Sequence, residues 1–195
     1  MVTNRLANAA QNGYRFHAVA SVSLLLDYLH EFDSIKNESN FEDIDLILLD
    51  GTHVCAQAKS SYDEESSDST SFFNKALVTL KEAQCKLPGC KSIYMTNIRK
   101  MLGANTDTSD FSSGETVWYS SMSEDNIDLI NERISADFDT GSFGIQFLKF
   151  EDGDRKDKPI LDKMDEIFTE IEYLDRLSYK HVYETWLLYL STNAT

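Results

Sequence analysis

The first regular apolar spacing in the chain is helical. It consists of Val19, Val22, Leu25, Leu26 and Leu29. Residues three and four apart share one face of a helix, so this stripe predicts a helix over residues 13–32. The residues on either side lack such spacing, and we expect a flexible leader over residues 1–12 and a polar connection over 33–40.

Two strand-like runs follow, at residues 43–49 and 53–60. Successive side chains of a strand point to opposite faces of a sheet. The apolar positions of the two runs are Ile44, Leu46, Leu48, Val54, Ala56 and Ala58. All of these are even-numbered, so both runs can bury one common face only if even positions lie opposite even positions.

This requirement constrains the turn between the two strands. The Asp-Gly dipeptide alone favours a two-residue loop, which would pair Leu49 with Thr52 and split the apolar positions across two faces. A three-residue loop pairs Leu48 with Thr52 instead and keeps even positions together. It also puts Gly51 in the left-handed conformation beside a β-bulge. We therefore expect the three-residue loop.

Beyond the hairpin, helices and strands alternate. The expected elements are an acidic Ser-rich loop over 61–71, a helix over 72–86, strands over 92–97 and 116–120, a helix over 123–138 and a strand over 143–150. A long amphipathic helix should begin near Pro159, with an apolar stripe of Ile160, Met164, Ile167, Phe168, Ile171, Leu174 and Leu177. This order indicates a mixed α/β sandwich.

Charge is distributed unevenly along the 195-residue chain, whose formal net charge is −15. Such an acidic balance argues against a nucleic-acid binder, because affinity for phosphate comes from Lys and Arg. Residues 72–106, however, contain six Lys or Arg and a single acid, Glu82. If DNA binds, we expect it near this segment, at Lys75, Lys81, Arg99 and Lys100. A basic surface patch without a ligand explains the same charges equally well.

The odd-numbered face of the hairpin carries the candidate chemistry. It presents Asp43, Asp45, Gln57 and Lys59 together. Carboxylate, amide and backbone carbonyl oxygens are hard ligands that suit Mg²⁺. A nearby ammonium can offset the charge that builds on a phosphate in a transition state. The alternative is a solvated polar face with a weak ion pair between Asp45 and Lys59.

The hairpin motif resembles that of the restriction-endonuclease-like superfamily, in which an Asp precedes a strand turn and a Glu-x-Lys or Gln-x-Lys. The matching residues are Asp45 and Gln57-Ala58-Lys59, with further likeness in Gly13–Phe16 at the helix entry and in the elements through Asn97. More narrowly, the chain is similar to Mrr-type restriction domains and the N-terminal nucleases of bacterial antiphage effectors. The resemblance covers residues 13–120 and implies a mixed sheet flanked by helices, with an α-β-β-α-β core.

The resemblance also implies roles for single residues. Asp45 would be the principal ligand of Mg²⁺ or Mn²⁺, with the side-chain oxygen of Gln57 and the backbone carbonyl of Ala58. Lys59 would position the attacking water. Asp43 is a rival for the principal ligand, because it lies on the same face and the family spacing varies.

Other chemistry is less well supported. The odd number of cysteines, Cys55, Cys85 and Cys90, indicates free thiols in a reducing compartment. We find neither a signal peptide nor a membrane-spanning stretch, and expect a cytoplasmic protein. No Gly-rich phosphate loop is present, so ATP hydrolysis is not expected. His17, at the start of the first helix, could approach the active face but is interpreted as structural. His53 is interpreted as too far from Asp45 to share a metal.

Two functions remain open from the sequence. The first is a Mg²⁺-dependent endonuclease that cuts double-stranded DNA in antiphage defence or restriction. It would act as a homo-oligomer, with a sensor or ATPase in another domain or a partner protein. The second is an inactive nuclease-fold module for assembly. The expected organisation is a leader over 1–12, a nuclease-like domain over 13–150 and a C-terminal helical segment over 151–195.

Overall fold

The computed structural model describes most of the chain. The described ranges are residues 2–37, 43–61, 69–112, 114–150, 158–169 and 176–192, and the side chains of 2–12, 169, 176–179, 191 and 192 lie outside the description. Within these ranges, none of the helices has the length and apolar character needed to cross a bilayer. All three cysteines are free, as expected, and only Cys85 is exposed.

Helices and strands alternate along the described chain. In order they are α1 (Val2–Asp27), β1 (Phe32–Asn37), β2 (Ile44–Leu48), β3 (His53–Lys59), α2 (Ser69–Lys86), β4 (Lys91–Thr96), β5 (Thr116–Trp118), α3 (Glu124–Asn131), β6 (Phe143–Phe147), α4 (Lys158–Thr169) and α5 (Arg176–Thr192). Short 3-10 turns precede α3 (Tyr119–Ser121) and β6 (Thr140–Ser142).

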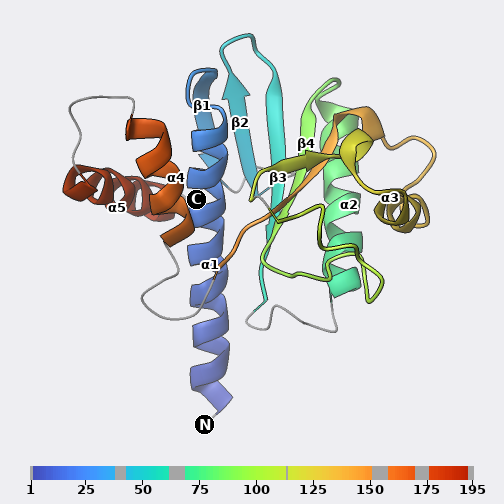
Figure 1. The fold of residues 1–195 in the computed structure, drawn as a ribbon, viewed down its shortest axis with the longest axis horizontal. Coiled ribbons are helices and arrows are strands. Elements are labelled where there is room, and N and C mark those ends of the chain that lie inside the picture. Colours follow the sequence, from blue (N-terminus) through green and yellow to red (C-terminus); the bar gives the residue numbers. More distant parts are fainter. Residues whose placement is uncertain are drawn as a thin grey trace.

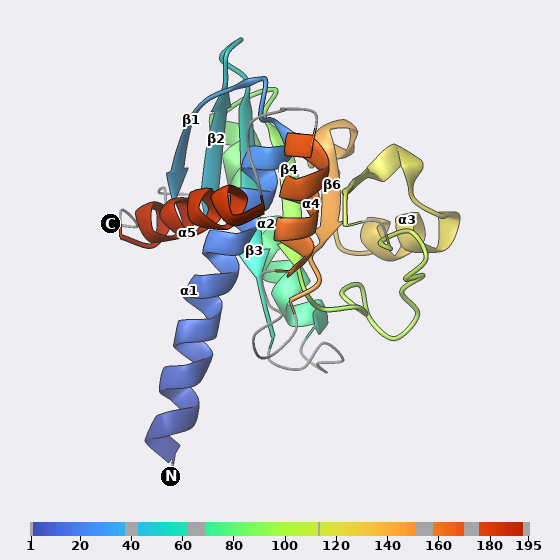
Figure 2. The ribbon, with the colours of Figure 1, turned by 60° about the vertical axis from the view of Figure 1, so that its left-hand side comes forward.

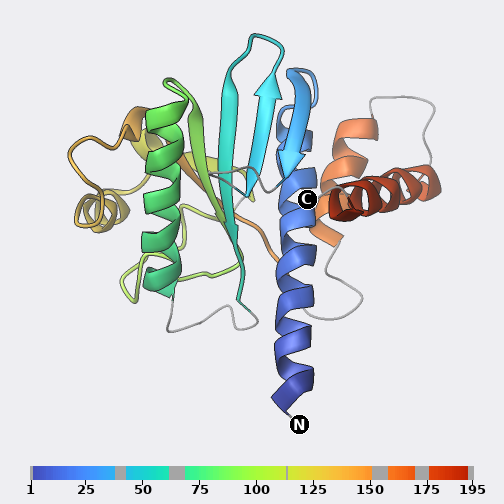
Figure 3. The same ribbon diagram turned by 180° about the vertical axis from the view of Figure 1, so that it is seen from behind.

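The strands form one six-stranded mixed sheet in the order β1-β2-β3-β4-β6-β5. The first three strands are antiparallel neighbours, β3, β4 and β6 run parallel, and β5 is antiparallel to β6. Helix α1 crosses one face of the sheet and α2 covers the other, as the front and back views show (Figures 1 and 3). The expected mixed α/β sheet flanked by helices is confirmed.

The register of the β2–β3 hairpin is the one expected. Leu46 lies opposite Val54, so even positions face even positions. In the turn, the Leu48 amide donates to the Thr52 carbonyl at 2.9 Å, and the Gly51 amide donates to the Leu48 carbonyl at 2.9 Å. Gly51 has a φ of 83°, in the left-handed region that favours glycine. The requirement to bury one face therefore determined the loop length.

The alternation of side chains produces two cores, one on each face. The even-numbered face packs with α1, α4 and α5 through residues that include Phe16, Leu24, Ile44, Leu46, Val54, Ala56, Met164 and Tyr183. The other face packs with α2 through Phe73, Leu77, Leu80, Tyr94, Phe143 and Ile145, among others. The polar odd positions of β2 and β3 thus belong to the face covered by α2.

Two expectations near the N-terminus differ from the structure. Residues 33–40 were expected to form a polar connection, but β1 occupies Phe32–Asn37 as an edge strand. An edge strand buries little of either face, so it lacks the apolar alternation that identifies a central strand. Residues 2–12, which were expected to belong to a flexible leader, form the first turns of α1, which begins at Val2. This end of α1 projects beyond the sheet (Figure 2).

The expected long C-terminal helix is wrong, because the structure has two helices, α4 and α5. A single helix over residues 158–192 would be about 50 Å long. Two shorter helices let both apolar stripes reach the core beside α1, through Met164 and Phe168 of α4 and Tyr183 and Leu190 of α5. Ile171 and Leu174 of the expected stripe, and the side chain of Leu177, lie outside the described residues.

We predict that Gly144→Ala destabilises the β5–β6 pair. A Cβ at Gly144 would lie 2.7 Å from Thr116 Cγ2 and 3.1 Å from Trp118 Cε3. Overpacking of this kind costs about 1–3 kcal/mol in the free energy of unfolding, measured by urea denaturation. Gly13→Ala is the control, because no atom lies within 4 Å of its added Cβ. An unchanged urea midpoint for Gly144→Ala would contradict this close packing.

Candidate active site

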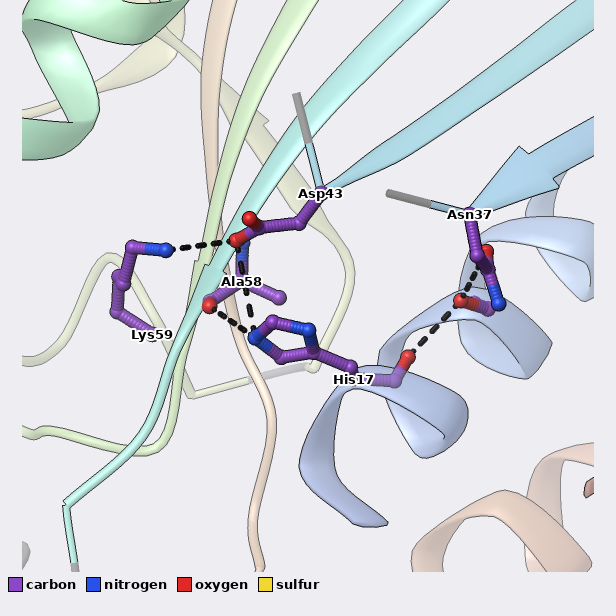
Figure 4. A network of polar contacts seen from close by, with 6 residues as sticks. His17, Asn37, Asp43, Ala58 and Lys59 are labelled. Atoms are coloured by element: carbon purple, nitrogen blue, oxygen red, sulfur yellow. Dashed lines mark hydrogen bonds and ion pairs between the residues drawn. The ribbon is translucent and has the colours of Figure 1, made fainter. Parts of the chain in front are cut away.

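Polar groups from three elements meet where β3 ends. Lys59 is the last residue of β3, and Asp43 directly precedes β2. Because β2 and β3 are antiparallel, the start of one strand lies beside the end of the other. Helix α1 passes this edge and contributes His17 (Figure 4).

Asp43 is the centre of the cluster. Its Oδ2 accepts a hydrogen bond from Lys59 Nζ at 2.8 Å and another from the Ala58 amide at 2.9 Å. The side chains of Asp43 and Lys59 are 19% and 29% exposed, so the ion pair is half-buried and remains accessible from solvent. One carboxylate therefore holds both the ammonium and the backbone of the Gln57-Ala58-Lys59 motif.

His17 completes the cluster from α1. Its Nε2 lies 2.9 Å from the Ala58 carbonyl and 3.7 Å from Asp43 Oδ2. A carbonyl can only accept a hydrogen bond, so Nε2 carries the proton in this contact. The turn of α1 that bears His17 is braced by Ser21, whose hydroxyl contacts the His17 carbonyl at 2.9 Å and Asn37 Oδ1 at 3.1 Å. His17 was interpreted as structural, and the structure places it beside Asp43, the approach to the active face that the sequence had left open.

Gln57 lies one strand position away from Ala58, on the face beneath α2. It is buried, and among the described residues its side chain makes no hydrogen bond. Continuing the β2–β3 register by one residue places it opposite Asp43. On its other side it pairs with Tyr94, where burial raises the pKa of the hydroxyl and keeps it neutral. Gln57 therefore brings an amide to the strand position opposite Asp43, with no side-chain hydrogen bond to another described residue.

The structure does not bring Asp45 to Lys59. Asp45 lies opposite Cys55, four residues before Lys59 on β3, which corresponds to about 13 Å along a strand. Asp45 and Lys59 emerge on the same face, as expected, but at different levels. The carboxylate that meets Lys59 is Asp43, which the sequence analysis named as the rival ligand.

Asp45 instead contacts His53, and the expectation that His53 lies too far from Asp45 is wrong. Its Nδ1 is 2.8 Å from Asp45 Oδ1, and the Asp45 side chain is only 7% exposed. The two residues are diagonal neighbours on the same face of the hairpin, a distance that long side chains can bridge. This pair is a separate polar contact nearer the turn.

We predict that His53→Ala lowers stability without affecting the Asp43 cluster. The substitution leaves the buried Asp45 carboxylate without its imidazole partner, which should cost about 1–3 kcal/mol in the free energy of unfolding. Thermal unfolding measures this cost, and the exposed His30→Ala is the control. A melting temperature equal to that of His30→Ala would show that the pair contributes nothing.

The expected DNA-contacting residues are scattered. Lys75 on α2 and Arg99 and Lys100 after β4 are exposed, and the Arg99 guanidinium lies 5.7 Å from the centre of the Phe147 ring. Lys81, also on α2, donates to Asp137 at 2.7 Å. That hydrogen bond lowers the pKa of Asp137 to about 2, so the pair persists at neutral pH. Lys81 therefore already has a carboxylate partner, with which a DNA phosphate would have to compete.

The donor atoms around Asp43 are oxygens, the type of ligand that hard cations prefer. Among the described residues, no three His, Cys, Asp or Glu side chains form a group able to hold a metal. The site offers one carboxylate from Asp43 and the carbonyl of Ala58, and the neighbouring Gln57 carries a further amide oxygen. Mg²⁺ is commonly held by one or two carboxylates and keeps several waters, so this set suits Mg²⁺ or Mn²⁺ better than zinc.

Comparisons of the chain with protein-family models, with curated proteins and with solved structures find no match. The functional proposal therefore rests on the geometry of the Asp43 cluster and on the resemblance of the hairpin motif.

Proposed function

We propose that this chain is a Mg²⁺-dependent DNA endonuclease domain of the restriction-endonuclease-like type. The observation that supports this most is the contact of Asp43 with both Lys59 and the Ala58 amide. It joins an acid to the Gln-x-Lys motif at the end of the hairpin. The observed succession is α1-β1-β2-β3-α2-β4, with β3 and β4 parallel. Apart from the additional edge strand β1, this order supports the α-β-β-α-β core that the resemblance implies.

The acid and the three residues of the Gln-x-Lys motif have roles in this proposal. Asp43, the Ala58 carbonyl and Gln57 would hold the cation. When bound, Mg²⁺ would polarise the phosphodiester and lower the pKa of a water. Lys59 would orient the attacking water and donate to a phosphate oxygen as negative charge develops on it. Attack of the water on phosphorus forms one P–O bond and breaks another, and the leaving oxygen takes up a proton.

Positive charge for binding a polyanionic substrate is present near the cluster, although the chain as a whole is acidic. Arg99 and Lys100 follow β4, whose carboxyl end lies at the same sheet edge as that of β3. With Lys75 they supply positive charge on a chain whose net charge is −15. We propose that double-stranded DNA lies along this edge, and that the acidic remainder limits binding elsewhere. The proposed setting is a cytoplasmic antiphage or restriction effector that works as a homo-oligomer or with a partner.

The direct test uses purified protein and supercoiled plasmid. We expect nicking with Mg²⁺ or Mn²⁺ and none in EDTA, with a structured RNA as the competing substrate. Absence of nicking at high enzyme concentration would leave the alternative, a nuclease-fold module for assembly. Light scattering on the same samples measures the oligomeric state, and a monomer that cleaves DNA well would remove the assembly function.

A further inference from the structure

The buried side-chain amide of Asn97 makes two hydrogen bonds to the backbone of Ser61, just beyond the proposed active site, and we call this pair of bonds the clasp. The side chain of Asn97 accepts a hydrogen bond from the Ser61 amide at 2.8 Å and donates one to the Ser61 carbonyl at 2.7 Å. Ser61 is two residues after Lys59, and Asn97 directly follows β4. The Asn97 side chain thus supplies the donor and acceptor that a neighbouring strand would supply.

The chain around Asn97 is itself firmly held. The Thr96 carbonyl accepts the Leu148 amide at 2.8 Å, which ties the end of β4 to the segment after β6. The Thr96 hydroxyl accepts the Ile98 amide at 3.2 Å. Asn97 is only 1% exposed, so its amide has little freedom to exchange partners with water. The clasp therefore connects Ser61 to a fixed part of the sheet.

Lys59 lies between two fixed points as a result. On one side the parallel ladder pairs it with Thr96, and on the other the clasp holds Ser61. Its long side chain must place Nζ against Asp43 from this backbone position. Without the clasp, the described restraints on this backbone would be the ladder and the contacts of Ala58 with Asp43 and His17, all of which lie at or before Lys59.

We propose that Asn97 is a positioning residue, which fixes the backbone after Lys59 and thereby holds the ammonium at Asp43. This inference rests on the proposed nuclease function for its effect on rate, but the positioning itself can be measured without DNA. Asp in place of Asn97 would lack the donor to the Ser61 carbonyl. Ala would lack both groups.

The same chain supplies a matched control. Asn126 is also buried, and its amide clasps the Asp107 backbone in the same way, with distances of 3.0 Å and 2.8 Å. It lies in α3, outside the Asp43 cluster. Asn126→Ala therefore removes a comparable clasp without touching the proposed site.

The experiment compares Asn97→Ala, Asn97→Asp and Asn126→Ala. In the wild type, Lys59 should react slowly with an acylating reagent, measured by mass spectrometry of the Lys59 peptide. We expect a rate at least about threefold higher in Asn97→Ala and unchanged in Asn126→Ala, because only the first loosens the Lys59 backbone. In plasmid cleavage, Asn97→Ala should lower kcat by about 10- to 100-fold with KM for DNA unchanged. Asn97→Asp should fall between the wild type and Asn97→Ala and provides the test if Ala prevents folding.

The outcomes separate the two proposals. Equal Lys59 labelling in the wild type and both Asn97 variants would overturn the positioning role. So would wild-type kcat in Asn97→Ala. A wild type that cleaves no DNA, with Lys59 labelling still raised by Asn97→Ala, would contradict the nuclease function and support the positioning.

Discussion

Asp43→Asn should reduce DNA cleavage by at least about 10²–10³-fold, the usual scale for losing one well-placed electrostatic group. Asp45→Asn should leave the cleavage rate within about twofold of the wild type, because Asp45 does not contact the groups proposed to react. The two carboxylates are two residues apart and lie on the same face. Only Asp43 contacts Lys59 and the Ala58 amide, whereas Asp45 contacts His53.

The Asn substitution keeps the shape of either side chain and removes its negative charge, so folding should be preserved. Circular dichroism and thermal unfolding check this for each variant. Initial rates of plasmid nicking at saturating Mg²⁺ provide the comparison. An active Asp43→Asn together with an inactive Asp45→Asn would make Asp45 the principal carboxylate and would contradict the arrangement proposed from the structure.

Lys59→Ala should change two measurements in opposite directions. Cleavage should fall by about 10²–10³-fold, because the ammonium no longer stabilises charge on the phosphate. Binding of Mn²⁺ should become tighter, because Lys59 Nζ and a cation compete for the Asp43 carboxylate, which Lys59 contacts at 2.8 Å. Because the ion pair between Asp43 and Lys59 is half-buried, its removal should lower the Kd for Mn²⁺ by about three- to tenfold.

Titration calorimetry with Mn²⁺ measures the affinity, and plasmid nicking measures the rate. Lys180→Ala is the control, since Lys180 on α5 is 62% exposed and pairs only with its helix neighbour Glu184 among the described contacts. That variant should match the wild type in both assays. Weaker Mn²⁺ binding in Lys59→Ala would indicate that the ammonium supports the cation site rather than competing with it.

The sequence predicted the face of each hairpin residue but ranked the two candidate acids in the opposite order from the geometry. Parity alone places Asp43, Asp45 and Lys59 on one side, and the three-residue turn then determines the pairing. That pairing already sets Asp45 opposite Cys55, four residues from Lys59. The same pairing places Asp43 closer to Lys59 along the hairpin than Asp45. Position along the strand, in addition to the face, could therefore have favoured Asp43.

Other features required contacts that no local pattern records. His17 meets Ala58 because α1 crosses the sheet at that level, 41 residues earlier in the chain. The edge strand β1 has little apolar alternation because it pairs on one side only. The division of the C-terminal segment into α4 and α5, which both contribute to the core beside α1, is not revealed by the apolar stripe of the sequence.

The most direct measurement of the central claim is a crystal structure of the protein soaked in Mn²⁺, with anomalous diffraction used to locate the ion. We expect an anomalous peak bound by a carboxylate oxygen of Asp43 and the carbonyl of Ala58, with Lys59 Nζ displaced from Asp43 Oδ2 but still beside the ion. A peak beside Asp45 and His53, or none near Asp43 at saturating Mn²⁺, would contradict it.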